Sequence, residues 1–189
     1  LTDELSAAID RALTLAEVED LYRPYKQKRR TRAMIAKEKG VQPLADLIFA
    51  QRRGDEPLAL AQAYVSDEKG VPDAQTAVQL AQDILAEQFS DDAALRQELR
   101  ELYQRTALLA SKAADAEKES VYEQYYDYAE PVKRIVGHRV LAIDRGEREG
   151  ALKVAVTLPE GHGASMLIQK FVKNQSPCGK LVQTAAEDA

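Results

Sequence analysis

Apolar residues recur every three or four positions through most of the first 110 residues, which is the spacing of one face of an α-helix. Between Thr2 and Leu21 this pattern predicts two short helices, or one helix that is kinked at Thr14. Thr14 and Glu17 have the spacing of a capping box, so a helix should begin there. The first part of the chain is therefore predicted to be a string of short helices.

Cap residues and prolines mark where the next helices begin. Thr31 is placed to cap a helix that ends at Gly40, because glycine readily takes the left-handed conformation of a helix end. Met34 and Ile35 are expected to face inward in this helix. Two more helices are predicted, each with a proline in its first turn, at residues 43–48 and 57–64.

The two longest predicted helices follow one another. The first begins at Val71 and Pro72 and ends near Phe89, and the second runs from Asp91 to about Ala110 with Ser90 as its cap. The apolar positions of the second helix repeat at helical spacing and are Leu95, Leu99, Leu102, Thr106 and Leu109. These two helices are expected to pack against each other.

The period changes in the last third of the chain. Leu152, Val154 and Val156 alternate with polar or small residues, which predicts a half-exposed strand. Residues 138–146 fit either a partner strand or a helix that ends at Gly146, and periodicity alone does not decide between them. Short helices are predicted at residues 162–172 and 178–189.

Tyrosines gather in an acidic segment before that region. Tyr122, Tyr125 and Tyr126 would lie on one face if the segment were helical. Such a face could stack on unpaired bases, but half-buried core tyrosines with solvated hydroxyl groups are the more common case. The acidic neighbours Glu119 and Glu123 also argue against contact with nucleic acid here.

Together these elements predict a mainly α fold, a multi-helix bundle with a helix-turn-helix-like portion and a minor β element near residues 151–158. Two subdomains are expected: a helical one at 1–110, and a mixed one at 111–189 that is truncated at the start of the next domain. The chain starts at Leu1 rather than at a methionine, so we expect it to be a piece of a longer protein.

Composition places the chain among soluble proteins. Of its 189 residues, 45% are hydrophobic and 30% are charged, and it contains no apolar run of the length that a membrane span needs. Cys178 is the single cysteine, so an intrachain disulfide is excluded, and no secretory leader precedes the first helix. We therefore expect a cytoplasmic protein that does not associate with membranes.

Charge is concentrated in one short stretch. Residues 22–40 hold eight basic residues and one acidic residue, a net charge of +7, in a chain whose net charge is −5. Such asymmetry points to a polyanionic partner. The residues predicted to contact phosphates are Lys26, Lys28, Arg29, Arg30 and Arg32. A solvated surface loop that pairs with acidic neighbours is an equally good interpretation at this point.

Catalytic and metal chemistry find little support in the sequence. His138 and His162 have no cysteine or second histidine at ligand spacing, so no metal site is predicted. Asp144, Glu147 and Glu149 could hold a magnesium ion, but basic residues lie among them and an ion-paired surface is the simpler account. We expect no catalytic residues, no cofactor and no enzymatic activity.

Three separated blocks resemble the N-terminal half of the Tex family of bacterial transcription accessory proteins. They are EDLYRPYKQKRRTRAMIAKEKGVQPLADLI, DILAE at residues 83–87, and HRVLAIDRGEREGALKV at residues 138–154. The third block departs slightly, because the family usually has Pro-Ser where this chain has Val136 and Gly137, and often Asn at Asp144.

The resemblance implies a cytoplasmic, multi-domain, mostly helical protein that binds nucleic acid and is related to a eukaryotic transcription elongation factor. In the family, an RNase-H-like domain, helix-hairpin-helix elements and a C-terminal oligonucleotide-binding-fold domain follow the region present here. The principal nucleic-acid-binding surface belongs to that later part. The resemblance thus implies RNA or DNA, and the transcription machinery, as partners of the whole protein.

The sequence therefore leaves two alternative functions. The first is a basic surface that contacts RNA or DNA phosphates without reading sequence. The second is a non-catalytic scaffold that docks the protein's own later domains or a protein of the transcription complex.

Overall fold

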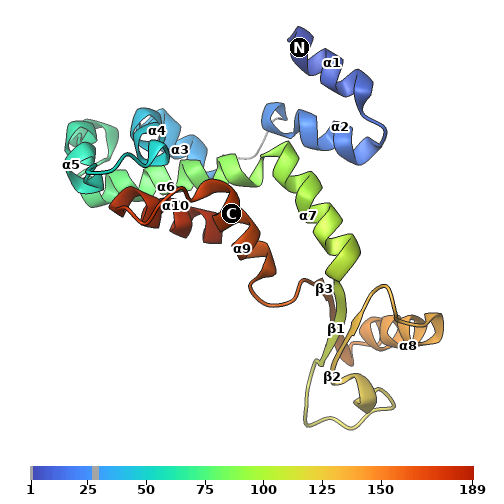
Figure 1. Cartoon of the computed structure of the whole chain (residues 1–189). Helices are drawn as coiled ribbons and strands as arrows, with labels where there is room; N and C mark the ends of the chain where they lie inside the picture. The colour runs from blue at the N-terminus through green and yellow to red at the C-terminus, as the bar shows by residue number, and fades with distance from the viewer. Residues whose placement is uncertain (1, 27–29) are drawn as a thin grey trace. The chain divides into compact units, whose positions relative to one another are not determined.

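A computed structural model describes residues 2–26 and 30–189. The chain forms two compact units (Figure 1). Unit 1 comprises residues 1–97 and 164–189, and unit 2 comprises residues 98–163. Helices dominate and are accompanied by one three-stranded sheet, which confirms the predicted mainly α fold with a minor β element. The units have different bounds from the predicted subdomains, because the last helix packs with the first part of the chain.

Unit 1 is helical throughout. Its elements before the long helix are short: α1 (Asp3–Arg11), α2 (Leu15–Tyr22), η1 (Arg23–Tyr25), α3 (Arg32–Glu38), α4 (Gln42–Ala50), α5 (Pro57–Ala61), η2 (Gln62–Tyr64) and η3 (Asp67–Lys69). The longer α6 (Ala74–Ser90) follows, and the unit is completed by most of α9 (His162–Phe171) and by α10 (Pro177–Asp188). The helix α7 (Ala93–Thr106) begins in unit 1 and ends in unit 2.

Side-chain caps fix several helix starts. The Thr14 hydroxyl accepts the Glu17 amide at 3.3 Å, so the first 22 residues form two helices rather than one kinked helix. Asp73 caps α6 by accepting the Thr76 amide at 2.7 Å. The expected capping role of Ser90 is wrong, because Ser90 is still part of α6, and the side chain of Asp92 accepts the Leu95 amide instead.

The core of unit 1 is built around α6, which packs against α3, α4, α5 and α10. Its buried face carries Ala77, Val78, Ala81, Ile84, Leu85 and Phe89. The expectation that Met34 and Ile35 face inward on α3 is wrong in detail, because the residues of α3 that are fully buried are Ala33 and Ala36. Small side chains let the α3 backbone approach α6 closely.

One buried glutamine ties the beginning of unit 1 to its end. Gln51 takes a left-handed backbone conformation, with φ of 52°, after the last turn of α4. Its side-chain amide donates to the Phe171 carbonyl and accepts the Lys173 amide, both at 2.8 Å. Its own carbonyl accepts the Asn174 side chain at 2.8 Å. The segment between α9 and α10 is thereby held against the end of α4.

Unit 2 is a small antiparallel sheet with one helix. Its elements after α7 are β1 (Leu108–Ala113), η4 (Glu123–Tyr125), β2 (Asp127–Pro131), α8 (Gly137–Arg148) and β3 (Leu152–Thr157). The strand order is β2-β1-β3, and Ser111 of β1 pairs with Tyr128 on one side and with Val154 on the other. A core of Tyr122, Tyr125, Ile143 and Leu152 joins α8 to the sheet.

The structure confirms one local expectation in unit 2, the strand, and changes or decides four others. The predicted strand near residues 151–158 is present as β3, but the helix predicted to reach Ala110 ends at Thr106, and Leu109 belongs to a strand. The tyrosine segment is not a continuous helix, since it forms η4 and β2. Residues 138–146 are helical, in α8. The partner of β3 is β1 rather than residues 140–143.

Candidate nucleic-acid interface

The basic segment, residues 22–40, connects α2 to the end of α3. Of the five predicted phosphate contacts, Lys26, Arg30 and Arg32 are placed by the structure, and Lys28 and Arg29 lie outside the described residues. Lys26 follows η1, and Arg30 and Arg32 flank the residue that caps α3. All three are exposed on unit 1, and Lys26 and Arg32 line one groove of its surface.

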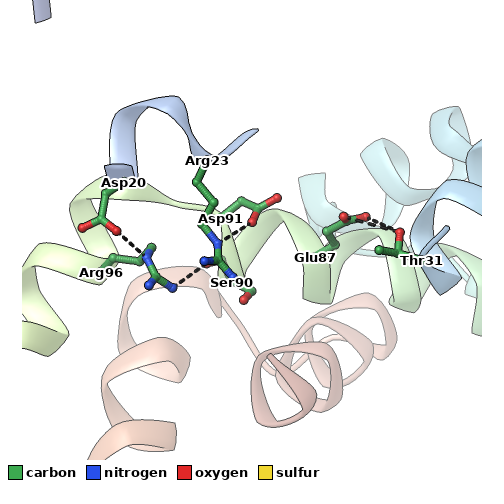
Figure 2. Close-up of polar contacts among 7 residues, drawn as sticks. All are labelled: Asp20, Arg23, Thr31, Glu87, Ser90, Asp91 and Arg96. Atoms are coloured by element: carbon green, nitrogen blue, oxygen red, sulfur yellow. Dashed lines mark hydrogen bonds and ion pairs between the residues drawn. The ribbon is translucent and has the colours of Figure 1, made fainter. Parts of the chain in front are cut away.

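Local sequence explains this geometry. The helix α2 ends at Tyr22, and Pro24 lies in a 3-10 turn, because its ring cannot continue the α-helical hydrogen bonds. Thr31 has extended backbone angles and its hydroxyl accepts the Met34 amide at 3.1 Å, as predicted for the cap of α3. The same hydroxyl donates to the Glu87 carboxylate at 3.3 Å (Figure 2). The cap thus also fixes the start of α3 to α6.

The placed arginines of the basic segment have acidic partners. Arg23 contacts Asp91 at 3.1 Å, as Figure 2 shows. Arg30 contacts Glu38 at 2.7 Å. Arg32 contacts Asp188 at 2.7 Å and Asp83 at 3.5 Å. The surface is therefore exposed and paired with acidic neighbours, as one of the two interpretations expected, and contact with phosphates stays a prediction.

Exposure decides how strong these pairs are. The side chains of Arg30 and Arg32 are each 68% exposed, whereas the Asp83 side chain is only 11% exposed. Exposed ion pairs are weak, because water and salt screen them and long side chains lose freedom in forming them. The guanidinium groups of Arg30 and Arg32 are therefore accessible to an anion from solvent.

The pKa values of Arg32 and of its partner Asp83 are shifted for different reasons. The pKa of Arg32 is raised, first by its hydrogen bond to Asp188 and then by the charges of Asp83 and Asp188. The pKa of Asp83 is also raised, because partial burial disfavours its charged form more than Arg32 stabilises it. Burial therefore disfavours the charged form of Asp83 even though Arg32 lies beside it.

A groove of about 500 Å³ lies between the basic segment and α6. Basic and acidic side chains both line it, and its charged residues are Arg23, Lys26, Arg32, Asp83, Glu87, Asp91 and Asp188. Asp83, Glu87 and Asp91 are spaced four residues apart along α6 and its C-terminal cap, and Asp188 ends α10, but no local sequence pattern pairs any of them with the basic segment. Nearby, Arg96 contacts Asp20 at 2.7 Å and the Ser90 carbonyl at 3.4 Å (Figure 2).

The tyrosines of unit 2 have structural positions. Tyr122 and Tyr125 belong to its core, as the sequence favoured. The Tyr126 hydroxyl hydrogen-bonds Lys118 and Ser120, and the Tyr128 hydroxyl donates to Glu130. Tyr122 and Tyr125 are buried and Tyr126 and Tyr128 are half-buried, so they do not form the exposed helical face that base stacking would use.

Other polar groups were candidates for metal binding or catalysis. His138 is exposed at the start of α8, and a ring nitrogen of His162 lies 3.1 Å from the Pro159 carbonyl. Asp144, once a candidate metal ligand, pairs with Arg148 at 2.8 Å. Within residues 2–26 and 30–189, no three His, Cys, Asp or Glu side chains converge as a metal site would require. None of the helices in the same part of the chain is long and apolar enough to cross a membrane.

Comparison with known proteins identifies the class to which this chain belongs. Residues 52–188 match the family model described as Tex central region-like. The chain therefore belongs to the Tex family, in agreement with the three sequence blocks. The matched region begins after the basic segment, and it includes α6 and α10, which supply the acidic side of the groove.

Similar proteins come from several bacteria. YdcI of Bacillus subtilis is 44% identical over 193 aligned positions, which cover 100% of this chain and 27% of that protein. Protein tex of Bordetella pertussis is 42% identical, over 84% of this chain and 20% of that protein. Transcriptional accessory protein Tex of Neisseria gonorrhoeae is 42% identical, over 82% of this chain and 20% of that protein. The chain thus spans only a fifth to a quarter of the length of these relatives.

Proposed function

We propose that this chain is a region of a transcription accessory protein and that its basic segment contacts nucleic-acid phosphates without reading sequence. The observation that carries the proposal is the 68% exposure of Arg30 and Arg32, within a segment of net charge +7. The Neisseria gonorrhoeae relative is named transcriptional accessory protein Tex, which supports a role in transcription. The proposal includes no catalytic step and no cofactor, and it assigns the protein to the cytoplasm.

Phosphate contact suits the chemistry of the segment. Arginine and lysine side chains at an exposed surface can exchange a weakly held carboxylate for a phosphate, which offers similar oxygen acceptors. Such contacts position a nucleic acid but carry no base information. The pair of helices α3 and α4, joined through Gly40, is the part to which the helix-turn-helix expectation applies, and the proposal does not require either helix to enter a groove.

The proposal is tested by titrating fluorescein-labelled single-stranded and duplex oligonucleotides at two salt concentrations. Contact with about four phosphates predicts a log–log salt slope of roughly −3.6 on duplex, and an affinity of order 10⁻⁴ to 10⁻⁶ M near physiological salt. Changing Lys28, Arg29, Arg30 and Arg32 together to alanine should remove most of this affinity.

The matched control changes Lys112, Lys118, Lys133 and Lys153, four exposed lysines of unit 2, to alanine. This variant has the same net charge as the first, so a general charge effect would weaken both equally. If the variant of the basic segment binds as well as the parent, or if the control loses as much affinity, the proposed interface is wrong.

A scaffold function is the second candidate, and a different observation favours it. Leu13, between α1 and α2, and Leu15, the first residue of α2, are 92% and 76% exposed. In unit 2, Val121 and Leu141 are 85% and 68% exposed. Exposed large apolar side chains are typical of protein contacts, such as those with the protein's later domains or a transcription-complex partner. Such a contact would be insensitive to salt and to added oligonucleotide.

A further inference from the structure

Three carboxylates form a regular row along α6 and the residue that follows its last turn. Asp83, Glu87 and Asp91 are four residues apart, so each lies about 6 Å further along the same side of the helix. Figure 2 shows Glu87 directed toward Thr31 and Asp91 directed toward Arg23, which are 56 and 68 positions earlier in the chain. We call these three residues the carboxylate row.

Each member of the row contacts the basic segment. Asp83 lies 3.5 Å from Arg32, Glu87 accepts the Thr31 hydroxyl at 3.3 Å, and Asp91 lies 3.1 Å from Arg23. The described residues of the segment therefore contact the row on both sides of positions 27–29, at Arg23 and at Thr31 with Arg32. A regularly spaced series of anionic oxygens is also what a nucleic-acid strand presents to a basic surface.

The two sides of these contacts differ in exposure. The side chains of Asp83 and Asp91 are 11% and 14% exposed, whereas those of Arg32 and Arg23 are 68% and 43% exposed. When an arginine turns outward toward an anion, it becomes more solvated, but the carboxylate that it leaves stays partly buried. A partly buried charge without its partner is costly. The row therefore opposes release of the arginines.

We propose that the carboxylate row is a built-in competitor of nucleic acid for Arg23 and Arg32, so that a phosphate reaches these two guanidinium groups by displacing Asp91 and Asp83. This inference rests on the proposed function of the segment. It adds an autoinhibitory contact within unit 1. Because each exposed pair is weak, a single phosphate gains little by displacing one carboxylate. A strand with several adjacent phosphates can displace the whole row.

The first test removes the charges of the row and keeps its shape. A variant with Asp83→Asn, Glu87→Gln and Asp91→Asn should bind the labelled oligonucleotides about 3- to 30-fold more tightly than the parent, given the small contribution of each exposed pair. The matched control is Glu56→Gln, Asp67→Asn and Glu68→Gln, which removes three exposed charges around α5 and η3. The control should tighten binding much less.

A second measurement does not depend on nucleic acid. Trypsin cleaves after Lys and Arg, which occur at five positions between residues 26 and 32. If the row holds the segment, the row variant should be cut there several-fold faster than the parent, and the control should not. Cleavage after Lys112 and Lys153 of unit 2 provides an internal reference for general loss of stability. The single variant Asp91→Asn should show part of the effect.

The outcomes separate this inference from the proposed function. If the segment of the row variant is cleaved no faster than that of the parent, the proposal that the row competes with nucleic acid is wrong. The same follows if the row variant and the control bind oligonucleotide with equally increased affinity. Faster cleavage without oligonucleotide binding by any variant supports the contact and overturns the proposed function. Faster cleavage together with tighter binding that is lost when Lys28, Arg29, Arg30 and Arg32 are also changed to alanine supports both.

Discussion

At the scale of single residues, Glu130 organises the turn between β2 and α8. Its carboxylate accepts hydrogen bonds from the Tyr128 hydroxyl and from Arg139, the latter at 2.8 Å. These bonds hold the pKa of Glu130 below its ordinary value of 4.5, with Tyr128 as the larger cause, and they raise the pKa of Tyr128 and Arg139. The ionised form of Glu130 is thus favoured by folding.

The sign of this shift gives a pH dependence. A carboxylate whose pKa is lower in the folded state contributes stability above its unfolded pKa, and loses it as pH falls through the folded value. Glu130→Gln should therefore lower the urea midpoint at pH 7, and the difference from the parent should shrink at pH values well below 4.5. Urea unfolding of both proteins across this range is the measurement. A difference that is constant with pH would contradict the assignment.

Glu123→Gln provides the control for Glu130. Glu123 is an exposed carboxylate of the same unit, in η4. Its replacement removes the same charge without removing the contacts of Tyr128 and Arg139. At pH 7 it should change the urea midpoint much less than Glu130→Gln does.

At the scale of elements, alanines decide how α3 meets α6. The apolar pattern of α3 directed attention to Met34 and Ile35, since large side chains dominate a helical pattern. The buried positions are Ala33 and Ala36, because a seven-residue helix close to α6 leaves room only for small side chains. This closeness also brings Thr31 and Arg32 to the carboxylate row. Local pattern therefore located α3 but not its inward face.

Ala36→Leu tests this packing. The side chain of Ala36 is fully buried, so three additional carbons must displace α3 from α6, and we expect a loss of about 1–3 kcal/mol in the free energy of unfolding. The control Met34→Leu lies on the exposed side of the helix and should change stability by less than about 0.5 kcal/mol. Urea unfolding gives both values. If Ala36→Leu is as stable as the parent, the close approach of α3 is wrong.

The strand β1 was not predicted, because its first residues fit the pattern of the preceding helix. Leu109 continues the helical spacing of Leu102 and Thr106, so local pattern extends the helix to Ala110. The chain leaves the helix at Thr106, because residues 108–113 hydrogen-bond to β2 on one side and to β3 on the other. Those partners lie up to about 50 positions away, and a helical window does not contain them.

At the scale of the whole molecule, the last helix of the chain packs against helices from its first half. The helix α10 buries Val182, Ala185 and Ala186 in unit 1, and it packs against α4 and α6. Gly179 permits this return, because a Cβ atom at that position would overlap the carbonyl oxygen of Asn174. Unit 1 is therefore closed by residues that are about 80 positions beyond the end of its first stretch.

Gly179→Ala should therefore destabilise unit 1, by about 2–3 kcal/mol, because the obstructing atom belongs to the backbone and cannot rotate away. The control is Gly163→Ala on α9, where the nearest atom, Leu158 Cδ1, is at an ordinary 3.6 Å, and where alanine favours the helix. Hydrogen exchange should rise in α4, α6 and α10 of the Gly179→Ala variant. An equal rise in β1, β2 and β3 would contradict two separately packed units.

The sequence by itself determined the helical class, the caps at Thr14 and Thr31, the strand at residues 152–157, and membership of the Tex family. These features depend on residues within a few positions of one another, or on blocks of sequence that can be matched directly. It also located the basic segment, and that Lys26, Lys28, Arg29, Arg30 and Arg32 contact phosphates stays a prediction.

Only the tertiary structure decided which distant groups meet. Arg32 reaches Asp83 and Asp188, and the buried side chain of Gln51 reaches Phe171 and Lys173. Such pairings depend on how helices bury their apolar faces against one another, and that free energy is shared among residues far apart in the chain. For this reason the charge of the basic segment was legible in the sequence, whereas the carboxylates that lie against it were not.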